Sequence, residues 1–371
     1  MTALPHKAAV VLAGLCLAVG AAACGNAREV GGSGGPPSGG QASGGRLTIG
    51  LLLPDYTSRM QQFDKPLIEK RIHQLCPACR VEFASAQHDV ATQQQQVDAM
   101  ITKRVKVMIL DAVDSKSLRY SVENARRAGI QIVAYDRLAE GPVSGYVSFD
   151  GDRVGRLQGE ALLKAMGAKA RGGQIVMMNG GGTDPNSAWF QKGALAVLQG
   201  KVKIGKAYET ANWRPENANI NMSGAIAALG PDRIDGVLSA NDGLASGVIA
   251  AMKAARMAPL PPVTGQDAEL AAVQRIVNGD QYMTVYKPFG PEAAAAAEMA
   301  VALGRGKPLD HIATHKINSP TTRGIPTVLL TPVAVTVHNI KDTLVKDGMY
   351  TIGQICTPKY AAACTKAGLT R

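Results

Sequence analysis

The chain has 371 residues, more than one ordinary domain needs and enough for two. Apolar residues make up 46% of it, so each domain can bury a core, whereas aromatic residues make up only 4%. The formal charge is +11, but no basic helix, no Lys/Arg cluster with interleaved aromatics and no zinc-finger spacing accompanies it, which argues against a nucleic-acid partner.

The first 23 residues have the layout of a secretory signal peptide. Residues 8–23 form an uncharged apolar run that would reach about 24 Å as a helix, short of the ~30 Å of a bilayer core. Small residues then lead to Cys24, as in a lipobox, although Ala21 stands where that pattern prefers Leu. We expect residues 1–23 to be removed and Cys24 to be acylated; a plain signal peptide cut near the same place is the alternative.

The segment 24–45 is rich in Gly and Ser. Such a segment buries too little apolar surface to offset the entropy cost of ordering its backbone. A coil of about 20 such residues spans roughly 25 Å. Its place after Cys24 indicates a tether between the membrane and a folded body. The expected location is extracytoplasmic, anchored to the outer face of the cell membrane, where a basic protein would lie beside anionic lipid or cell-wall polymer.

From residue 46 onward, short β-branched runs alternate with amphipathic helical stretches. This alternation predicts an α/β fold with parallel sheets, and the apolar strands predict helices on both faces of each sheet. In chain order, strands are expected at 47–53, 81–84, 105–111, 131–135, 174–178, 203–208, 236–239, 263–265 and 283–286, and helices near 62–75, 91–103, 115–128, 152–166, 186–199, 216–229, 243–256, 268–277 and 291–304.

The series is too long for one open sheet, and a Gly- and Pro-containing stretch at 139–145 is the expected break. Ligands of such sheets bind beyond the carboxyl ends of the strands. Helix capping explains some polar residues there, Asp111 and Asn241 in particular, but not the cations Arg137 and Lys287. The strand ends carry Asp55, Asp111, Asp136, Arg137, Asn179, Asn241, Asp242, Gln266, Asp267 and Lys287.

Four cysteines remain after Cys24, an even number that predicts two disulfides in an exported chain. The expected pairs are Cys76–Cys79 and Cys356–Cys364, each closing a small loop. A redox or zinc site is the alternative. A thioredoxin-type redox site would place its CxxC at the start of a helix after a strand, whereas Cys76 and Cys79 follow a helical run. The spacing of the second pair is longer than that of a zinc knuckle. The histidines, His88 among them, show no metal spacing and are expected at the surface, so no metal or other cofactor is expected.

The polar residues at the strand ends suit a sugar. Carboxylates accept hydrogen bonds from hydroxyls, Arg, Lys and Asn donate, and an aromatic face packs on the C–H patches of the ring. Trp213, one of two Trp in the chain, supplies such a face.

Several motifs then make the chain similar to a known family. It resembles the periplasmic xylose-binding proteins and their relatives, the ribose-binding class of substrate-binding proteins of ABC importers, over nearly all of residues 47–350. The matching stretches are AYDR at 134–137, VSFD at 147–150, WRPEN at 213–217, SAND at 239–242, GQDA at 265–268, TVYKP at 284–288, LLTP at 329–332 and NIKDT at 339–343.

This resemblance implies a type I periplasmic binding protein, with two Rossmann-like lobes joined by a three-segment hinge near residues 140, 260 and 320. The implied N-terminal lobe is 46–139 plus 265–315, and the implied C-terminal lobe is 140–264 plus 316–371. The implied function is that of a monomeric lipoprotein, not an enzyme, that delivers xylose or a similar sugar to the permease and ATPase subunits of an ABC importer. A sugar-sensing subunit of a membrane receptor kinase and, more remotely, a glycoside hydrolase are the alternatives.

The resemblance also implies sugar contacts. The family often has Trp directly after the first arginine, and Met60 stands there instead, either as a softer apolar wall or as a sign of a different sugar. Asp267 and Lys287 are expected on the first lobe. The implied substrate-binding residues are Arg59, Met60, Asp136, Arg137, Asp184, Asn186, Trp213, Asn217, Asp242, Asp267 and Lys287.

Overall fold

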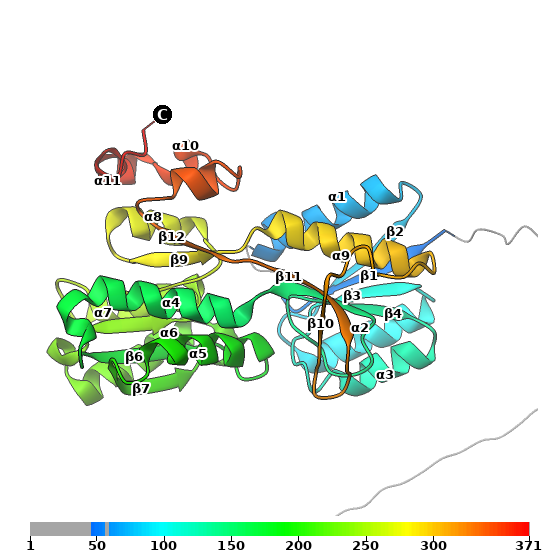
Figure 1. Ribbon diagram of the computed structural model, residues 1–371, viewed down its shortest axis with the longest axis horizontal. Helices are drawn as coiled ribbons and strands as arrows, with labels where there is room; N and C mark the ends of the chain where they lie inside the picture. Colours follow the sequence, from blue (N-terminus) through cyan, green and yellow to red (C-terminus); the bar gives the residue numbers. More distant parts are fainter. Residues whose placement is uncertain (1–45, 56–58, 371) are drawn as a thin grey trace, which may run out of the picture. The chain divides into compact units, whose positions relative to one another are not determined.

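The computed structural model describes residues 46–55 and 59–370. The expected signal peptide, the expected acylation of Cys24 and the tether therefore lie outside the described residues. Within the part that is described, no helix is both long and apolar enough to cross a membrane. Strands and helices alternate as predicted and build two α/β lobes (Figure 1).

The first lobe is built on a mostly parallel sheet with the strand order β10-β11-β5-β4-β3-β1-β2. In register, Ile49 of β1 lies opposite Val81 of β2 and Val107 of β3. The hairpin of β10 and β11 at one edge is antiparallel. The strands are β1 (Thr48–Leu53), β2 (Arg80–Ser85), β3 (Val107–Leu110), β4 (Gln131–Tyr135), β5 (Gly145–Phe149), β10 (His315–Ile317) and β11 (Ile325–Leu330).

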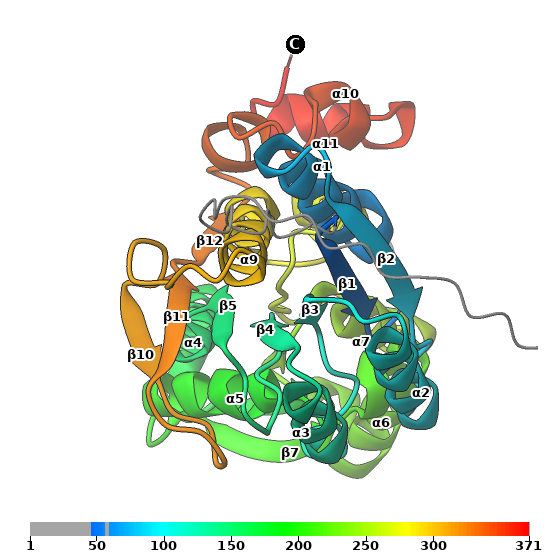
Figure 2. The ribbon, with the colours of Figure 1, turned by 90° about the vertical axis from the view of Figure 1, so that its right-hand side faces the viewer.

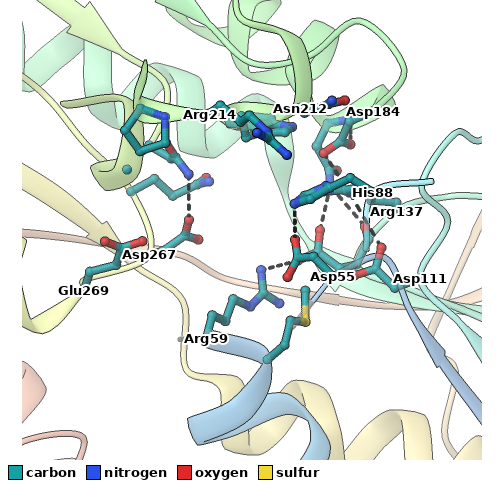
Figure 3. A pocket seen from close by; sticks show the side chains of 18 of the residues that line it. Asp55, Arg59, His88, Asp111, Arg137, Asp184, Asn212, Arg214, Asp267 and Glu269 are labelled. Carbon is teal, nitrogen blue, oxygen red and sulfur yellow. Dashed lines mark hydrogen bonds and ion pairs between the residues drawn. The ribbon is translucent and has the colours of Figure 1, made fainter. Parts of the chain in front are cut away.

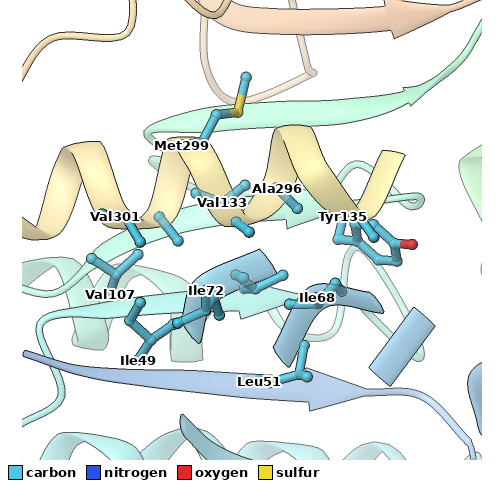
Figure 4. Packing of buried hydrophobic residues seen from close by; sticks show 14 of the residues in the cluster. Ile49, Leu51, Ile68, Ile72, Val107, Val133, Tyr135, Ala296, Met299 and Val301 are labelled. Carbon is cyan, nitrogen blue, oxygen red and sulfur yellow. The ribbon is translucent and has the colours of Figure 1, made fainter. Parts of the chain in front are cut away.

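Helices cover both faces of this sheet because alternate side chains of its buried strands point to opposite sides. Ile49 and Val133 pack against α1 and α9 (Figure 4), whereas Leu52 and Leu110 pack on the other side, against α2 and α3. The first-lobe helices are η1 (Met60–Asp64), a π-helical turn, α1 (Lys65–Leu75), α2 (Val90–Thr102), α3 (Arg119–Arg127) and α9 (Phe289–Gly304).

The second lobe contains a parallel sheet of order β7-β6-β8 and an antiparallel pair, β12-β9. The segment 262–267 joins them: Val237 N donates to Pro262 O at 2.9 Å, and Tyr282 N donates to Val263 O at 2.9 Å. The strands are β6 (Gln174–Asn179), β7 (Lys203–Glu209), β8 (Gly236–Ser239), β9 (Met283–Tyr286) and β12 (Val333–Thr336).

Four helices sandwich this second sheet. Leu162 of α4 and Leu198 of α5 pack on one face, and Met222 of α6 and Val248 of α7 pack on the other. The helices of this lobe before β9 are α4 (Gly151–Met166), η2 (Gly167–Ala170), α5 (Pro185–Leu198), η3 (Ala211–Trp213), α6 (Pro215–Leu229), η4 (Pro231–Arg233), α7 (Asp242–Ala254) and α8 (Leu270–Asn278).

The C-terminal residues pack on α8 and β12 of the second lobe. Tyr350 of this region also reaches the first lobe, because its ring lies 6.3 Å from that of Phe63 on η1. Both expected disulfides, Cys76–Cys79 and Cys356–Cys364, are present, which excludes zinc binding by their thiolates. The short elements here are η5 (Lys341–Val345), α10 (Ile352–Ile355), η6 (Pro358–Tyr360) and α11 (Ala361–Lys366).

The expected lobe boundaries are wrong at three places, because the strand pairing places the crossings elsewhere. β5, expected in the second lobe, pairs with β4 of the first, and β11 pairs with β5. β9, expected in the first lobe, pairs with β12 of the second. The chain therefore crosses between the lobes near residues 150, 287–288 and 331–332, not near 140, 260 and 320.

Candidate functional site

A pocket of about 340 Å³ lies where the carboxyl ends of the strands of the two lobes face each other (Figure 3). Small-molecule sites range from roughly 300 to 1,000 Å³, so this pocket suits a small ligand. It is lined by Asp55, Arg59, Met60, His88, Asp111, Asp136, Arg137, Asp184, Asn186, Phe190, Asn212, Trp213, Arg214, Pro215, Asn241, Gly243, Ser246, Gln266, Asp267, Glu269 and Lys287.

Arg59 enters the pocket from the π-helical turn η1, held between three buried carboxylates. Its guanidinium lies 2.9 Å from Asp64, 2.6 Å from Asp136 and 3.2 Å from Glu292. The guanidinium carbon also lies 4.5 Å from the centroid of the Phe289 ring. These contacts fix the direction of a donor that faces the ligand space.

Asp136 is the junction between the lobes. Its Oδ1 accepts a hydrogen bond of 2.7 Å from Asn186 Nδ2 of the second lobe, and Lys287 Nζ lies 3.6 Å from its Oδ2. Burial raises the pKa of Asp136, but Lys287, Arg59 and Arg137 outweigh burial and hold that pKa well below its usual range. Asp136 therefore stays ionised and acts as a hydrogen-bond acceptor.

Arg137 makes the second bridge between the lobes. Its Nε lies 3.0 Å from Asp184 of the second lobe and 3.6 Å from Asp111 of the first. Burial raises the pKa of Asp111 well above its usual value, although Arg137 opposes the shift. Both carboxylate oxygens of Asp111 are buried and have no hydrogen-bond partner among the described residues, so they are available to ligand hydroxyls.

Trp213 supplies an apolar wall from the second lobe. A Cβ at residue 180 would lie 2.0 Å from the indole, so only Gly180 lets the ring occupy this position. Phe190 supports the indole edge-on at 6.3 Å between centroids. The indole Nε1 is buried and has no partner among the described residues, which leaves it free to donate.

The remaining predicted contacts, Asp267 and Lys287, form an ion pair of 2.9 Å, in which Lys287 directly follows β9 and Asp267 ends the segment 262–267. They were expected on the first lobe, but Asp267 N donates to Val285 O of β9, which belongs to the second. Glu269 lies beside them, and burial followed by the charge of Asp267 raises its pKa to about 7.

Two predicted site residues do not line the pocket. The carboxylate of Asp242 is fully buried in the second lobe and accepts hydrogen bonds from Gln281 Nε2 at 2.7 Å and Thr284 Oγ1 at 2.8 Å. Asn217 donates to Ala211 O at 3.1 Å and holds the loop that carries Trp213. Both support the site without facing the ligand space.

The pocket also contains residues that were not predicted as contacts. Asn241 caps Leu244 N at 2.9 Å, as expected, but it lines the pocket as well. His88 is not a plain surface residue, because it lies 3.2 Å from Asp55 and lines the pocket with it. Asp55, Asp111 and Asn241 follow strands, whereas the strand expected at 263–265, before Gln266, forms only a bridge at Val263. The strand-end pattern contained all four residues.

No metal centre accompanies this polar cluster: among residues 46–55 and 59–370, no group of three or more His, Cys, Asp and Glu is placed to hold a metal ion. The pocket instead presents alternating carboxylates and cations from both lobes beside an indole. Such a surface matches a neutral ligand with several hydroxyls.

Comparison with known proteins gives the same result. Residues 49–308 match the model of the periplasmic binding protein domain. The chain is 34% identical over 310 residues to the D-xylose-binding periplasmic protein of Escherichia coli, covering 82% of this chain and 91% of that one. It is 32% identical to a multiple sugar-binding periplasmic protein of Azospirillum brasilense, covering 83% of this chain and 90% of the relative.

Solved structures agree with these relatives. An ABC transporter solute-binding protein from Clostridium phytofermentans with bound β-D-glucose is 29% identical, with a TM-score of 0.77, and the match covers 83% of this chain and 99% of that one. A carbohydrate transporter solute-binding protein from Chloroflexus aurantiacus in complex with D-glucose is 27% identical, with a TM-score of 0.76 and coverage of 83% and 98%. These are binding proteins and not enzymes, and the chain belongs to their family, the periplasmic binding proteins, as a sugar-binding protein of the ABC transporter type.

Proposed function

We propose that this protein binds xylose outside the cytoplasm, as a lipoprotein anchored through Cys24, and delivers it to the permease and ATPase subunits of an ABC importer. The observation that carries the proposal is the pocket itself, in which hydrogen-bond donors and acceptors from both lobes surround a space beside one indole. The sensing alternative is not carried further, because nothing in the site favours it over transport.

Each lobe would contribute a distinct part of the sugar contacts. Trp213 would pack on a C–H face of the ring, with Met60 as an apolar wall from the first lobe. Asp111, Asp136 and Asp184 would accept hydrogen bonds from hydroxyls, and Arg59, Arg137, Asn186 and Lys287 would donate. Asp267 would orient Lys287 through their ion pair of 2.9 Å.

Xylose is favoured among monosaccharides by the relatives that align over most of the chain at 34% identity. The competing candidate is glucose, which is bound in the solved structures from Clostridium phytofermentans and Chloroflexus aurantiacus. The two sugars differ by one hydroxymethyl group on C5, and one such group changes discrimination by about 1–3 kcal/mol when it meets a fitted wall. We expect xylose to bind at least about tenfold more tightly than glucose.

Isothermal titration calorimetry with xylose, glucose, ribose, arabinose and galactose tests this proposal. Binding of xylose should also raise the melting temperature, because the ligand binds only the folded state. No heat with any of the five sugars would overturn the sugar assignment, and tighter binding of glucose would overturn the choice of xylose.

Trp213→Ala is the matching variant. Truncation of a central aromatic anchor costs at least about 2 kcal/mol, roughly thirtyfold in affinity. The control is Trp189→Ala, because Trp189 packs against the first-lobe core and does not line the pocket. Equal losses of affinity in the two variants would contradict the role of Trp213.

The lipid anchor is tested separately. Mass spectrometry of the protein purified from the membrane fraction should show an acyl-modified cysteine as its first residue. A chain released into the medium and beginning after residue 23 without lipid would contradict the anchor and leave the sugar site untouched.

A further inference from the structure

A cluster of cations lies at the end of the first lobe opposite the pocket. There the chain enters the strands of the first sheet, whereas the pocket lies at their carboxyl ends; Figure 2 looks onto this lobe. All members of the cluster are exposed. We name this cluster the basic end face; it consists of Arg46, Arg80, Lys103, Arg104, Lys106, Arg305 and Lys307.

The backbone holds these residues on one continuous surface. The N–H groups of Arg80 and Lys106 donate to the carbonyls of the two residues that follow Arg46, at 2.9 Å each. The Arg305 guanidinium donates to Leu75 O at 3.1 Å, which joins the end of α9 to the end of α1. The cluster is therefore one surface and not a set of scattered charges.

Most of this charge has no counterion. Glu82 lies 2.6 Å from both Arg80 and Lys103 and partly neutralises them. For the rest of the face, no carboxylate lies within 4.0 Å among residues 46–55 and 59–370. These five cations are Arg46, Arg104, Lys106, Arg305 and Lys307.

We propose that the basic end face docks on a membrane surface that carries anionic headgroups. Arg46 is the residue at which the described structure begins, and the chain leads from it back to Cys24 in 22 residues. If Cys24 is acylated, this face is the part of the body whose attachment point lies nearest the bilayer. Electrostatic attraction falls off over a Debye length of about 8 Å, so the face acts only when it touches the headgroups, and an attachment point beside it makes such contacts frequent.

The face would supply the second of two membrane signals. Each Lys or Arg near an anionic surface contributes about 1 kcal/mol of attraction, so the face would add to the binding that the lipid anchor supplies. Because the pocket lies at the other end of the same strands, a docked protein keeps its sugar site open. The proposal uses the proposed anchor to identify the nearby surface, but the docking itself requires no acyl chain.

Vesicle co-sedimentation of the full exported chain carrying Cys24→Ser tests the docking without the lipid. The probe is phosphatidylcholine vesicles with about one third phosphatidylglycerol, compared with phosphatidylcholine alone, at about 0.05 M and 0.5 M salt. We expect binding only to the anionic vesicles and only at low salt. Binding of equal strength to neutral vesicles would overturn the proposal.

Two variants with the same loss of four charges locate the binding surface. The test variant replaces Arg104, Lys106, Arg305 and Lys307 by Gln, and we expect its partition coefficient to fall at least about tenfold, since each cation near such a surface contributes roughly fivefold. The control replaces four exposed lysines near the C-terminus and should retain partitioning within about threefold. The control positions are Lys341, Lys346, Lys359 and Lys366.

Equal losses in both variants would show a general charge effect and would overturn the docking face. Binding to soluble polyglycerophosphate but not to anionic vesicles would overturn it in favour of a cell-wall polymer. Xylose titration of the test variant separates this proposal from the sugar function, since the variant should bind sugar as the parent chain does.

Discussion

The two ends of the first sheet both carry cations, but in opposite electrostatic states. At the pocket end, Arg59 and Arg137 are largely buried, and each lies within 3.0 Å of a carboxylate. At the other end, Arg104 and Lys106 are exposed and have no carboxylate within 4.0 Å among the described residues. The formal charge of +11 does not distinguish these groups. The nearby carboxylates do distinguish them. Cations that are paired with carboxylates organise the pocket, whereas unpaired cations remain available to bind another surface.

The largest loss of stability is expected when the buried ion pairs at the pocket end of the sheet are broken. Arg59→Met leaves Asp64, Asp136 and Glu292 without their shared partner, and breaking a buried ion pair in this way costs about 3–5 kcal/mol. Urea unfolding measures this loss. Arg71→Met, which breaks the half-exposed bridge to Glu298, should cost less than about 1 kcal/mol and serves as the control.

If Arg59→Met and Arg71→Met lowered the free energy of unfolding by similar amounts, buried and half-exposed ion pairs would not differ in their contribution to stability.

The next effect depends on pH and concerns Glu269, whose pKa is raised to about 7 by burial and then by Asp267. An unfolded Glu titrates near about 4.3, so the folded protein binds this proton more tightly, and the resulting stability is lost as the pH rises through 7. Glu269→Gln removes the carboxyl group and with it this pH-dependent contribution to stability. The stability of the variant relative to the parent should therefore rise by up to about 3 kcal/mol between pH 4 and pH 8 in denaturant unfolding.

Parallel stability curves for Glu269→Gln and the parent over this range would contradict the assignment.

A smaller effect is expected at Asp111, the pocket carboxylate whose pairing is incomplete. Its nearest cation, Arg137, is 3.6 Å away, and burial raises its pKa. Asp111→Asn should stabilise the sugar-free protein by about 1 kcal/mol at pH 7, yet weaken sugar binding roughly tenfold or more, because an amide replaces one of the two carboxyl oxygens that would meet the sugar. Thermal unfolding and calorimetry on the same sample measure both.

Asp136→Asn is the matched comparison, because Asp136 is fully paired and its loss should destabilise the protein. A destabilised Asp111→Asn would mean that this carboxylate is already satisfied.

The smallest effect is expected at the opposite end of the sheet. Arg104→Gln should change the free energy of unfolding by less than about 0.5 kcal/mol, because the side chain is exposed and no carboxylate depends on it. A change above 1 kcal/mol in urea unfolding would show that the basic end face contributes to stability.

The strand-end pattern located much of the pocket because polar residues directly after apolar strands stand out in sequence. It could not tell which of two neighbours faces the ligand: Asn241 lines the pocket, whereas Asp242, one residue later, turns into the second lobe. The backbone conformation after the strand decides which of the two side chains faces the pocket, and the residue types alone do not reveal that conformation. Asn212 lies within the 3₁₀ turn η3 and Arg214 directly follows it, so the pattern gave no signal for them.

The lobe division was harder to predict than the fold class. β5 is five residues long and follows the Gly- and Pro-containing stretch that was interpreted as a lobe boundary. That stretch is a turn within the first lobe, since Ser144 N donates to Ile132 O at 2.7 Å and the chain returns to pair with β4. Strand partners far apart in the chain, such as β5 and β11, are set by tertiary packing.

The π-helical turn η1 connects the pocket with the aromatic contact between the two lobes. It carries Arg59 at its start, and Phe63, four residues later, packs on Tyr350 from the second lobe and on Phe289 at a crossing. A movement of Tyr350 or Phe289 would therefore reach the residue that directly precedes the turn, Arg59, which lines the pocket. The contact between the lobes and the proposed sugar donor thus share one short turn, so a change at either place is felt at the other.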